Sequence, residues 1–145
     1  MEVFEPNIPN DITVTGLIPQ KYPFVMVDEL LHYSDKAVVS SLTIVSGNIF
    51  TKNEVFTEPG LIEHMAQTVA LHTGYQYFLL NKPAPTGYIG SIKSVEIFNL
   101  PKLNDRLITT VTVLHEIMGV TLVNIVVTLS GETIATSEMK TVIAK

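Results

Sequence analysis

The sequence contains no cysteine among its 145 residues. That absence excludes a disulfide framework, a thiolate nucleophile and a zinc–thiolate site. Charge is also scarce, because charged residues make up 16% of the chain and hydrophobic residues 46%. A disordered chain has the opposite balance, so the composition predicts a folded protein. The length suits a single domain over residues 1–145, and the high apolar content favours an oligomer that buries further surface.

Basic residues are fewer than acidic ones, 9 against 14, which gives a formal net charge of −5. This balance argues against non-specific nucleic-acid binding, which requires a basic surface. The longest stretch without Asp, Glu, Lys or Arg runs from His64 to Asn81 and includes histidine, glutamine and threonine. It predicts a buried helix and no membrane span. The acidic start of the chain lacks the features of a signal peptide, so we expect a soluble cytoplasmic protein.

Runs of β-branched and aromatic residues, separated by turn residues, predict the strands of a sheet. Prolines near the start indicate an irregular N-terminal arm over residues 1–17, and a polar loop, expected to be functional, spans Ser46–Glu58. The short connections between the last three strands predict an antiparallel meander. The expected strands are Phe24–Leu31, Ala37–Val45, Thr86–Phe98, Arg106–Glu116, Gly119–Leu129 and Glu132–Ile143.

One long helix is predicted between the second and third strands, from Pro59 to Leu80. Pro59 and Gly60 suit a helix start, and Lys82-Pro83 suits its end. Apolar residues recur at three- and four-residue steps and surround most of the helix, which indicates burial on nearly all sides. Two strands, a buried helix and four long strands predict an α+β domain whose sheet wraps one helix.

Metal and cofactor sites have little support in the sequence. His64 and His72 would lie about 12 Å apart on a helix, too far to share one ion. No metal-ligand run, phosphate-binding loop or dinucleotide fingerprint occurs. We therefore expect no metal and no cofactor, and interpret the histidines as surface or satisfied core residues. A cluster of basic residues after the helix, Lys93, Lys102 and Arg106, is a candidate for receiving an acidic carrier or a phosphate. The competing interpretation is an ordinary solvated face.

Glu63 is the strongest candidate for chemistry. A carboxylate in the first turn of an apolar helix is often a plain charge–dipole pair. However, Gln67 lies one turn later on the same face, and the small residues Ala66 and Ala70 lie close by in the sequence. Together these four residues would suit the wall of a narrow acyl tunnel.

Three segments resemble the 3-hydroxyacyl-acyl-carrier-protein dehydratases of the hotdog fold. Ile18–Asp28 is similar to the opening signature of that family, and Pro59–Gln67 to the start of its central helix, including Glu63 and Gln67. Ile89–Leu107 resembles the strand and turn that follow the helix. The resemblance implies a dimer with two active sites at its interface. It also implies that Glu63 is the helix acid and that the substrate carbonyl lies near the backbone N–H of Gly60.

The chain departs from that family in the loop before the helix. The family has Gly-His-Phe at this point, and its histidine works with the helix acid of the other subunit. Here the corresponding residues are Glu54, Val55 and Phe56, so Val55 occupies the position of the missing histidine. No histidine lies between Tyr33 and Glu63. We therefore expect an impaired version of the family's mechanism, since general-base catalysis contributes about 10²–10⁴ in rate.

These features leave three functions open. The first is a dehydratase-like protein that acts on acyl thioesters in a fatty-acid-like or polyketide-like pathway, the second a non-catalytic acyl- or carrier-binding subunit of a heteromeric dehydratase, and the third an acyl thioesterase that uses Glu63. The expected partners are acyl carrier protein or a coenzyme A thioester, and a second copy or a related hotdog subunit. The expected substrate-binding residues are Gly60, Gln67, Phe56, Ala66, Ala70 and Lys93.

Overall fold

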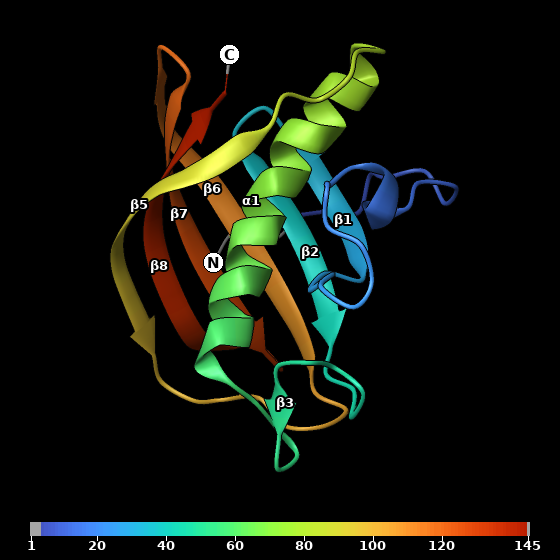
Figure 1. Cartoon of the computed structure of the whole chain (residues 1–145), viewed down its shortest axis with the longest axis vertical. Coiled ribbons are helices and arrows are strands. Elements are labelled where there is room, and N and C mark those ends of the chain that lie inside the picture. The colour runs from blue at the N-terminus through green and yellow to red at the C-terminus, as the bar shows by residue number, and fades with distance from the viewer. Residues whose placement is uncertain (1–3, 145) are drawn as a thin grey trace.

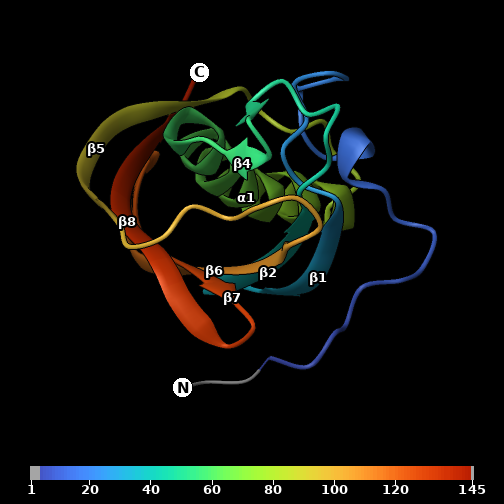
Figure 2. The same cartoon turned by 90° about the horizontal axis from the view of Figure 1, so that it is seen from below.

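The computed structural model describes residues 4–144, and its main feature is one long helix, α1 (Glu58–Leu79), against a curved antiparallel sheet. Figure 1 shows α1 crossing the concave side of the sheet, and Figure 2 shows the sheet curling around it. The sheet order is β1-β2-β6-β7-β8-β5. Its strands are β1 (Glu29–Ser34), β2 (Ala37–Thr43), β5 (Gly87–Ile97), β6 (Arg106–Ile117), β7 (Val120–Leu129) and β8 (Glu132–Ile143).

The last three strands form the predicted antiparallel meander, and β8 has the predicted bounds. Both of its hairpins turn through two residues with positive φ, Met118-Gly119 and Ser130-Gly131. Glycine takes that conformation without steric cost, and such turns match the twist of the strands they join. Alternate residues of the meander, such as Val111 and Ile125, are fully buried on the concave side, where they meet α1 and form the core.

The helix α1 lies within one residue of its predicted bounds at each end. Leu61, Met65 and Leu71 are fully buried, as are the polar side chains of His64 and Thr68. Burial extends around most of the helix because the sheet curls past it, as the all-round apolar pattern predicted.

Two segments differ from the sequence-based expectation. The segment Phe24–Asp28 is not a strand, since β1 begins only at Glu29; its backbone is hydrogen-bonded to side chains of α1. The polar loop Ser46–Glu58 contains a small hairpin, β3 (Thr51–Lys52) and β4 (Val55–Phe56), and its last residue already belongs to α1. Contacts with distant residues explain the first difference. The small hairpin is local, since its strands pair through a turn at Asn53-Glu54, where both residues have positive φ.

The N-terminal arm, as far as the structure describes it, is irregular apart from the short 3-10 helix η1 (Val14–Gly16). Its first part follows β1, and its last part passes along α1. At that crossing a side chain on Gly74 would collide with the backbone carbonyl of Leu17. Glycine at position 74 therefore lets the arm lie directly on the helix and form one wall of the site described next.

Candidate active site

Glu63 and Gln67 form a hydrogen-bonded pair one turn apart on α1. Gln67 Nε2 donates to Glu63 Oε2 over 2.7 Å. The spacing of four residues places the two side chains on the same face of the helix, as the sequence indicated. Gln67 is buried, whereas Glu63 is partly exposed. The carboxyl group of Glu63 is thus accessible to a ligand, and the buried amide of Gln67 holds it in place.

The amide of Gln67 makes further hydrogen bonds to the segment before β1. Its Nε2 also donates to the carbonyl oxygen of Phe24 over 2.8 Å, and its Oε1 accepts from the backbone N–H of Met26 over 2.6 Å. Both amide hydrogens are therefore used within the protein. Gln67 orients Glu63 and holds this segment. It has no free N–H left to donate to a substrate, and its role in binding substrate stays a prediction.

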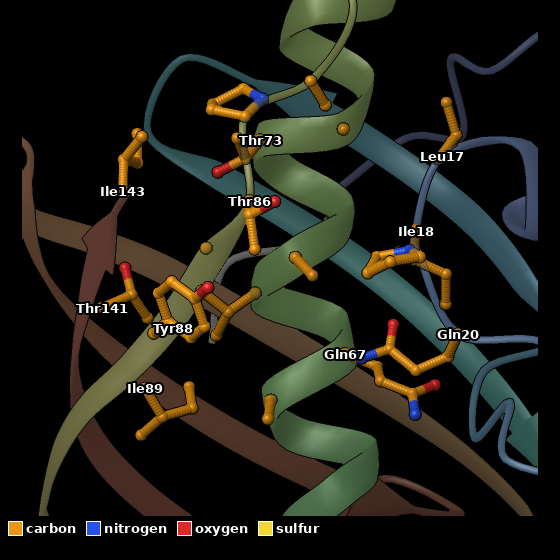
Figure 3. Close-up of a pocket in the computed structure, with 18 of the residues that line it drawn as sticks. Leu17, Ile18, Gln20, Gln67, Thr73, Thr86, Tyr88, Ile89, Thr141 and Ile143 are labelled. Atoms are coloured by element: carbon orange, nitrogen blue, oxygen red, sulfur yellow. The ribbon is translucent and has the colours of Figure 1, made fainter. Parts of the chain in front are cut away.

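A cavity of about 400 Å³ lies beside this pair, shown in Figure 3. It lies between α1, the segment Gly16–Gln20, the start of β5 and the end of β8. Its wall on α1 contains Glu63, Ala66, Gln67 and Ala70, the four residues that the sequence proposed for an acyl tunnel. Side chains with hydrocarbon groups, including Ile18, Val69, Tyr88, Ile89 and Ile143, line much of the remainder. The cavity suits an extended apolar ligand with one polar end near Glu63.

His64 is fully buried between α1, the segment before β1 and β6. Its Nδ1 donates to the Met26 carbonyl oxygen over 2.7 Å, so its Nε2 accepts from the Thr109 hydroxyl over 2.7 Å. Burial lowers the pKa of His64 to about 4. It is a neutral core residue that ties α1 to β6, and it faces away from the cavity.

The other three histidines also lie away from the cavity. His72 is buried and hydrogen-bonded to the Ser34 carbonyl oxygen over 2.9 Å, and burial lowers its pKa. His32 on β1 is hydrogen-bonded to the Glu5 carbonyl oxygen, and His115 is exposed on β6. No histidine therefore lines the cavity within the described part of the chain. The site of a single chain has a carboxyl group and lacks an imidazole.

The remaining predicted site residues lie outside this cavity. Val55 is in β4, partly buried, and pairs with Lys52 and Lys102. Phe56 is fully buried and packs against Gly60, where a side chain would come within 2.6 Å of the Phe56 ring. Lys93 forms an exposed ion pair with Glu138 at 3.7 Å. The wall of the cavity thus contains Glu63, Gln67, Ala66 and Ala70, whereas Val55, Phe56, Gly60 and Lys93 are not part of its lining.

Sequence reasoning missed the wall formed by the N-terminal arm. Leu17, Ile18 and Gln20 line the cavity, together with Tyr88 and Ile89 from β5. The only signal for this wall was the resemblance of Ile18–Asp28 to the family's opening signature. Its position against α1 depends on the close approach at Gly74, which no local pattern predicts.

A family model for the ApeP-like dehydratases matches residues 12–144. This chain belongs to that family. It is 28% identical over 137 residues to the 3-hydroxyacyl-acyl-carrier-protein dehydratase FabZ of Tolumonas auensis, covering 87% of this chain and 89% of the relative. It is 26% identical to the FabZ of Vibrio cholerae, covering 90% of this chain and 89% of that one. This ApeP-like protein is therefore dehydratase-like, as the sequence motifs predicted.

The ApeP-like chain also resembles a chain of the dehydratase heterocomplex ApeI:P from Xenorhabdus doucetiae. The TM-score is 0.86 at 16% identity, and the match covers 92% of each chain. At that identity the likeness shows the fold, which confirms the predicted hotdog architecture. Within residues 4–144 no helix is long and apolar enough to cross a membrane, and no group of three or more His, Asp and Glu side chains could hold a metal ion.

Proposed function

We propose that this chain is the acid-bearing subunit of a 3-hydroxyacyl thioester dehydratase, in which a related hotdog subunit supplies the missing histidine. The proposal rests on the cavity that places Glu63 beside an apolar wall, together with Val55, which stands where the family has its loop histidine. In this proposal Glu63 would supply the acid of the reaction, and the partner would supply the base.

Dehydration removes a proton from C2 of the acyl chain and hydroxide from C3, which leaves a C2–C3 double bond and water. Glu63 would donate the proton that converts the departing hydroxide to water. Because Gln67 donates to Oε2, the proton would be carried by Oε1, the other carboxyl oxygen. Gln67 thereby fixes which oxygen faces the substrate. The imidazole of the partner subunit would take the proton from C2.

The neighbours support a partner of this kind. The heterocomplex that shares this fold joins two chains named ApeI and ApeP, and this chain belongs to the ApeP-like family. We propose that the partner pairs along β5, the last strand in the sheet order. All of β5 except Val95 and Ile97 is exposed, and residues of its first part line the cavity. A subunit at this edge would therefore lie next to the site that it completes.

The natural substrate would be attached to acyl carrier protein or coenzyme A, as the FabZ relatives are named for acyl-carrier-protein substrates. Such substrates also favour a cytoplasmic location. The alternative of a non-catalytic acyl- or carrier-binding subunit is favoured by one observation, the valine at position 55 in place of the family's loop histidine. The two functions differ in whether Glu63 takes part in turnover once the partner is present.

The test measures formation of the enoyl thioester from a 3-hydroxyacyl thioester, with the purified chain alone and in complex with a hotdog subunit that carries the family's loop histidine. We expect little turnover alone and efficient turnover in the complex. In the complex, Glu63→Gln should reduce kcat by at least about a hundredfold. Glu58→Gln, an exposed control at the start of the same helix, should not.

Unchanged turnover of the Glu63→Gln complex would contradict the acid role and favour the non-catalytic subunit. Release of free thiol without enoyl product would instead indicate a thioesterase. A separate experiment adds the histidine to the isolated chain through Val55→His. A gain of turnover there would support the correspondence between position 55 and the family's loop histidine.

A further inference from the structure

The cavity beside Glu63 follows α1 toward the C-terminal end of the helix. Its lining residues on α1 begin at Glu63 and end at Gly74. A helix rises by 1.5 Å per residue, so Thr73 lies about 15 Å beyond Glu63 along the axis. Figure 3 shows Thr73 close to Thr86, farther along the helix than Gln67. The space is therefore elongated, with the carboxyl group near one end and Thr73 near the other.

A second, smaller cavity lies behind the Thr73 end of the first. Its volume is about 70 Å³, and it lies between α1 and the strands β6, β7 and β8. The side chains between the two cavities are those that line both of them, namely Val69, Thr73, Thr141 and Ile143. These four residues form a partition, and Thr73 is the one among them that lies farthest along α1.

The wall between Glu63 and Thr73 suits hydrocarbon better than the pantetheine arm of a carrier. Ala66, Val69 and Ala70 supply alkyl groups there, and both amide hydrogens of Gln67 are already used within the chain. A pantetheine arm has two amides, whose burial without partners would be unfavourable. An acyl chain has none, so we expect the acyl part of the substrate in this space.

We infer that Thr73 is a specificity-determining residue that sets the longest acyl chain the cavity accepts. This inference rests on the proposed function, because it takes Glu63 as the place of the reacting carbons. An acyl chain that extends from Glu63 along α1 meets the partition at Thr73, and a longer chain must leave its excess carbons in water. A smaller side chain at position 73 opens a passage into the second cavity, whereas a larger one ends the space earlier.

The test measures binding of saturated acyl pantetheine thioesters of increasing chain length, which cannot be dehydrated, to the purified full chain. Each buried methylene should raise the affinity about fourfold, and methylenes beyond the partition should add little. The affinity of the unsubstituted protein should therefore rise with chain length and then reach a plateau. Thr73→Ala should move the start of this plateau to longer chains, and Thr73→Leu should move it to shorter ones.

Thr112 provides the matched controls, because it is a half-buried threonine of β6 that lines neither cavity. Thr112→Ala and Thr112→Leu should leave the plateau unchanged. Ala70 lies about 4.5 Å nearer to Glu63 along the helix, so Ala70→Leu should start the plateau at still shorter chains than Thr73→Leu. Alanine is the best helix former, and Thr73→Ala therefore decides the result if a leucine variant fails to fold.

Three outcomes would overturn the inference. The first is a plateau that begins at the same chain length in Thr73→Ala as in the unsubstituted protein. The second is an equal change in affinity at every chain length, which would place the pantetheine arm against Thr73. The third is an affinity of the unsubstituted protein that does not depend on chain length.

The two proposals fail in different ways. If the plateau moves with the side chain at position 73 but no enoyl product forms in the subunit complex, the cavity measures acyl length and the proposed dehydration is wrong. If the product forms and the plateau stays fixed in the Thr73 variants, dehydration stands and this role of Thr73 is wrong.

Discussion

The two edges of the sheet are completed in different ways. At β1 the chain covers its own edge, since the backbone N–H of Asn7 donates to Leu31 and its side-chain amide exchanges two hydrogen bonds with the backbone of Tyr33, at 2.8 and 3.0 Å. At β5 the described part of the chain adds no further strand, and the apolar side chains of Tyr88 and Ile92 are exposed.

An uncovered strand edge is a place where another chain can pair. The edge that the chain leaves open is also the one that borders the cavity, whereas the covered edge is formed by strands absent from its lining. The open edge and the cavity thus lie together. If the proposed function holds, one partner at β5 would complete both the sheet and the site.

The largest effect is expected at the open edge. Ile92→Lys places a charge on an exposed apolar position of β5, so pairing with a second subunit should weaken by about a hundredfold and turnover should fall with it. Sedimentation and the dehydration assay measure the two effects. Leu114→Lys on β6 is the matched control, since it is similarly exposed and lies away from this edge. Equal dissociation of both variants would contradict a specific role for β5.

Acid should lower the free energy of unfolding through the core histidine His64, independently of either sheet edge. Folded His64 stays neutral down to its pKa of about 4, whereas the unfolded chain binds a proton at that residue below its ordinary value of 6.5. Because the unfolded state takes up the proton first, stability present above pH 6.5 is lost as the pH falls from 6.5 toward 4. The loss should reach about 2 kcal/mol at pH 5, and the lowered pKa of His72 acts in the same direction.

Urea unfolding at pH 7.5 and pH 5, at two protein concentrations, checks this prediction. A loss that originates in the core does not depend on concentration, whereas dissociation at β5 does. Equal stability at the two pH values would show that His64 is not held neutral.

A smaller effect is expected at the covered edge. Asn7→Ala removes both side-chain hydrogen bonds to Tyr33, which are exposed, so the free energy of unfolding should fall by about 1 kcal/mol. The oligomeric state should not change, because this edge pairs within the chain. Chemical unfolding with size-exclusion chromatography measures both properties. Dissociation of the Asn7→Ala complex would show that the β1 edge also takes part in pairing with the partner.

The smallest effect is expected for Lys93 on β5, which forms an exposed ion pair with Glu138. Lys93→Gln should change stability by less than about 0.5 kcal/mol, since exposed pairs contribute little. Its effect on KM decides the predicted role in carrier binding. If Lys93→Gln raises KM more for a carrier-linked substrate than for the pantetheine thioester, the result would support that role. Equal changes in KM for the two substrates would leave Lys93 as part of a solvated face.

Local patterns predicted much of the fold because its elements are long and regular. The periodic apolar residues of α1 and the two-residue turns of the meander are encoded within a few residues. The segment Phe24–Asp28 was different. Its apolar, β-branched residues favour a strand, but Gln67 and His64 take up its backbone hydrogen bonds across about 40 positions of sequence.

Some residues of the candidate site could be predicted from local spacing, and others depend on distant contacts. Glu63 and Gln67 lie four residues apart on one helix, so their pairing could be predicted from spacing alone. Gln20 could not, because its place in the cavity depends on the arm meeting Gly74. Nor could a single sequence place Val55 relative to Glu63, since that relation would involve two chains in the proposed complex.

The three hydrogen bonds of Gln67 have a consequence for how this protein can evolve. One amide fixes both the carboxyl of Glu63 and the backbone of Phe24–Met26, so no other side chain at position 67 satisfies all three groups with the same geometry. A descendant that loses the amide must rebuild the segment and the acid together. We therefore expect positions 63 and 67 to change in concert among related chains, and a lineage that abandons catalysis to lose both.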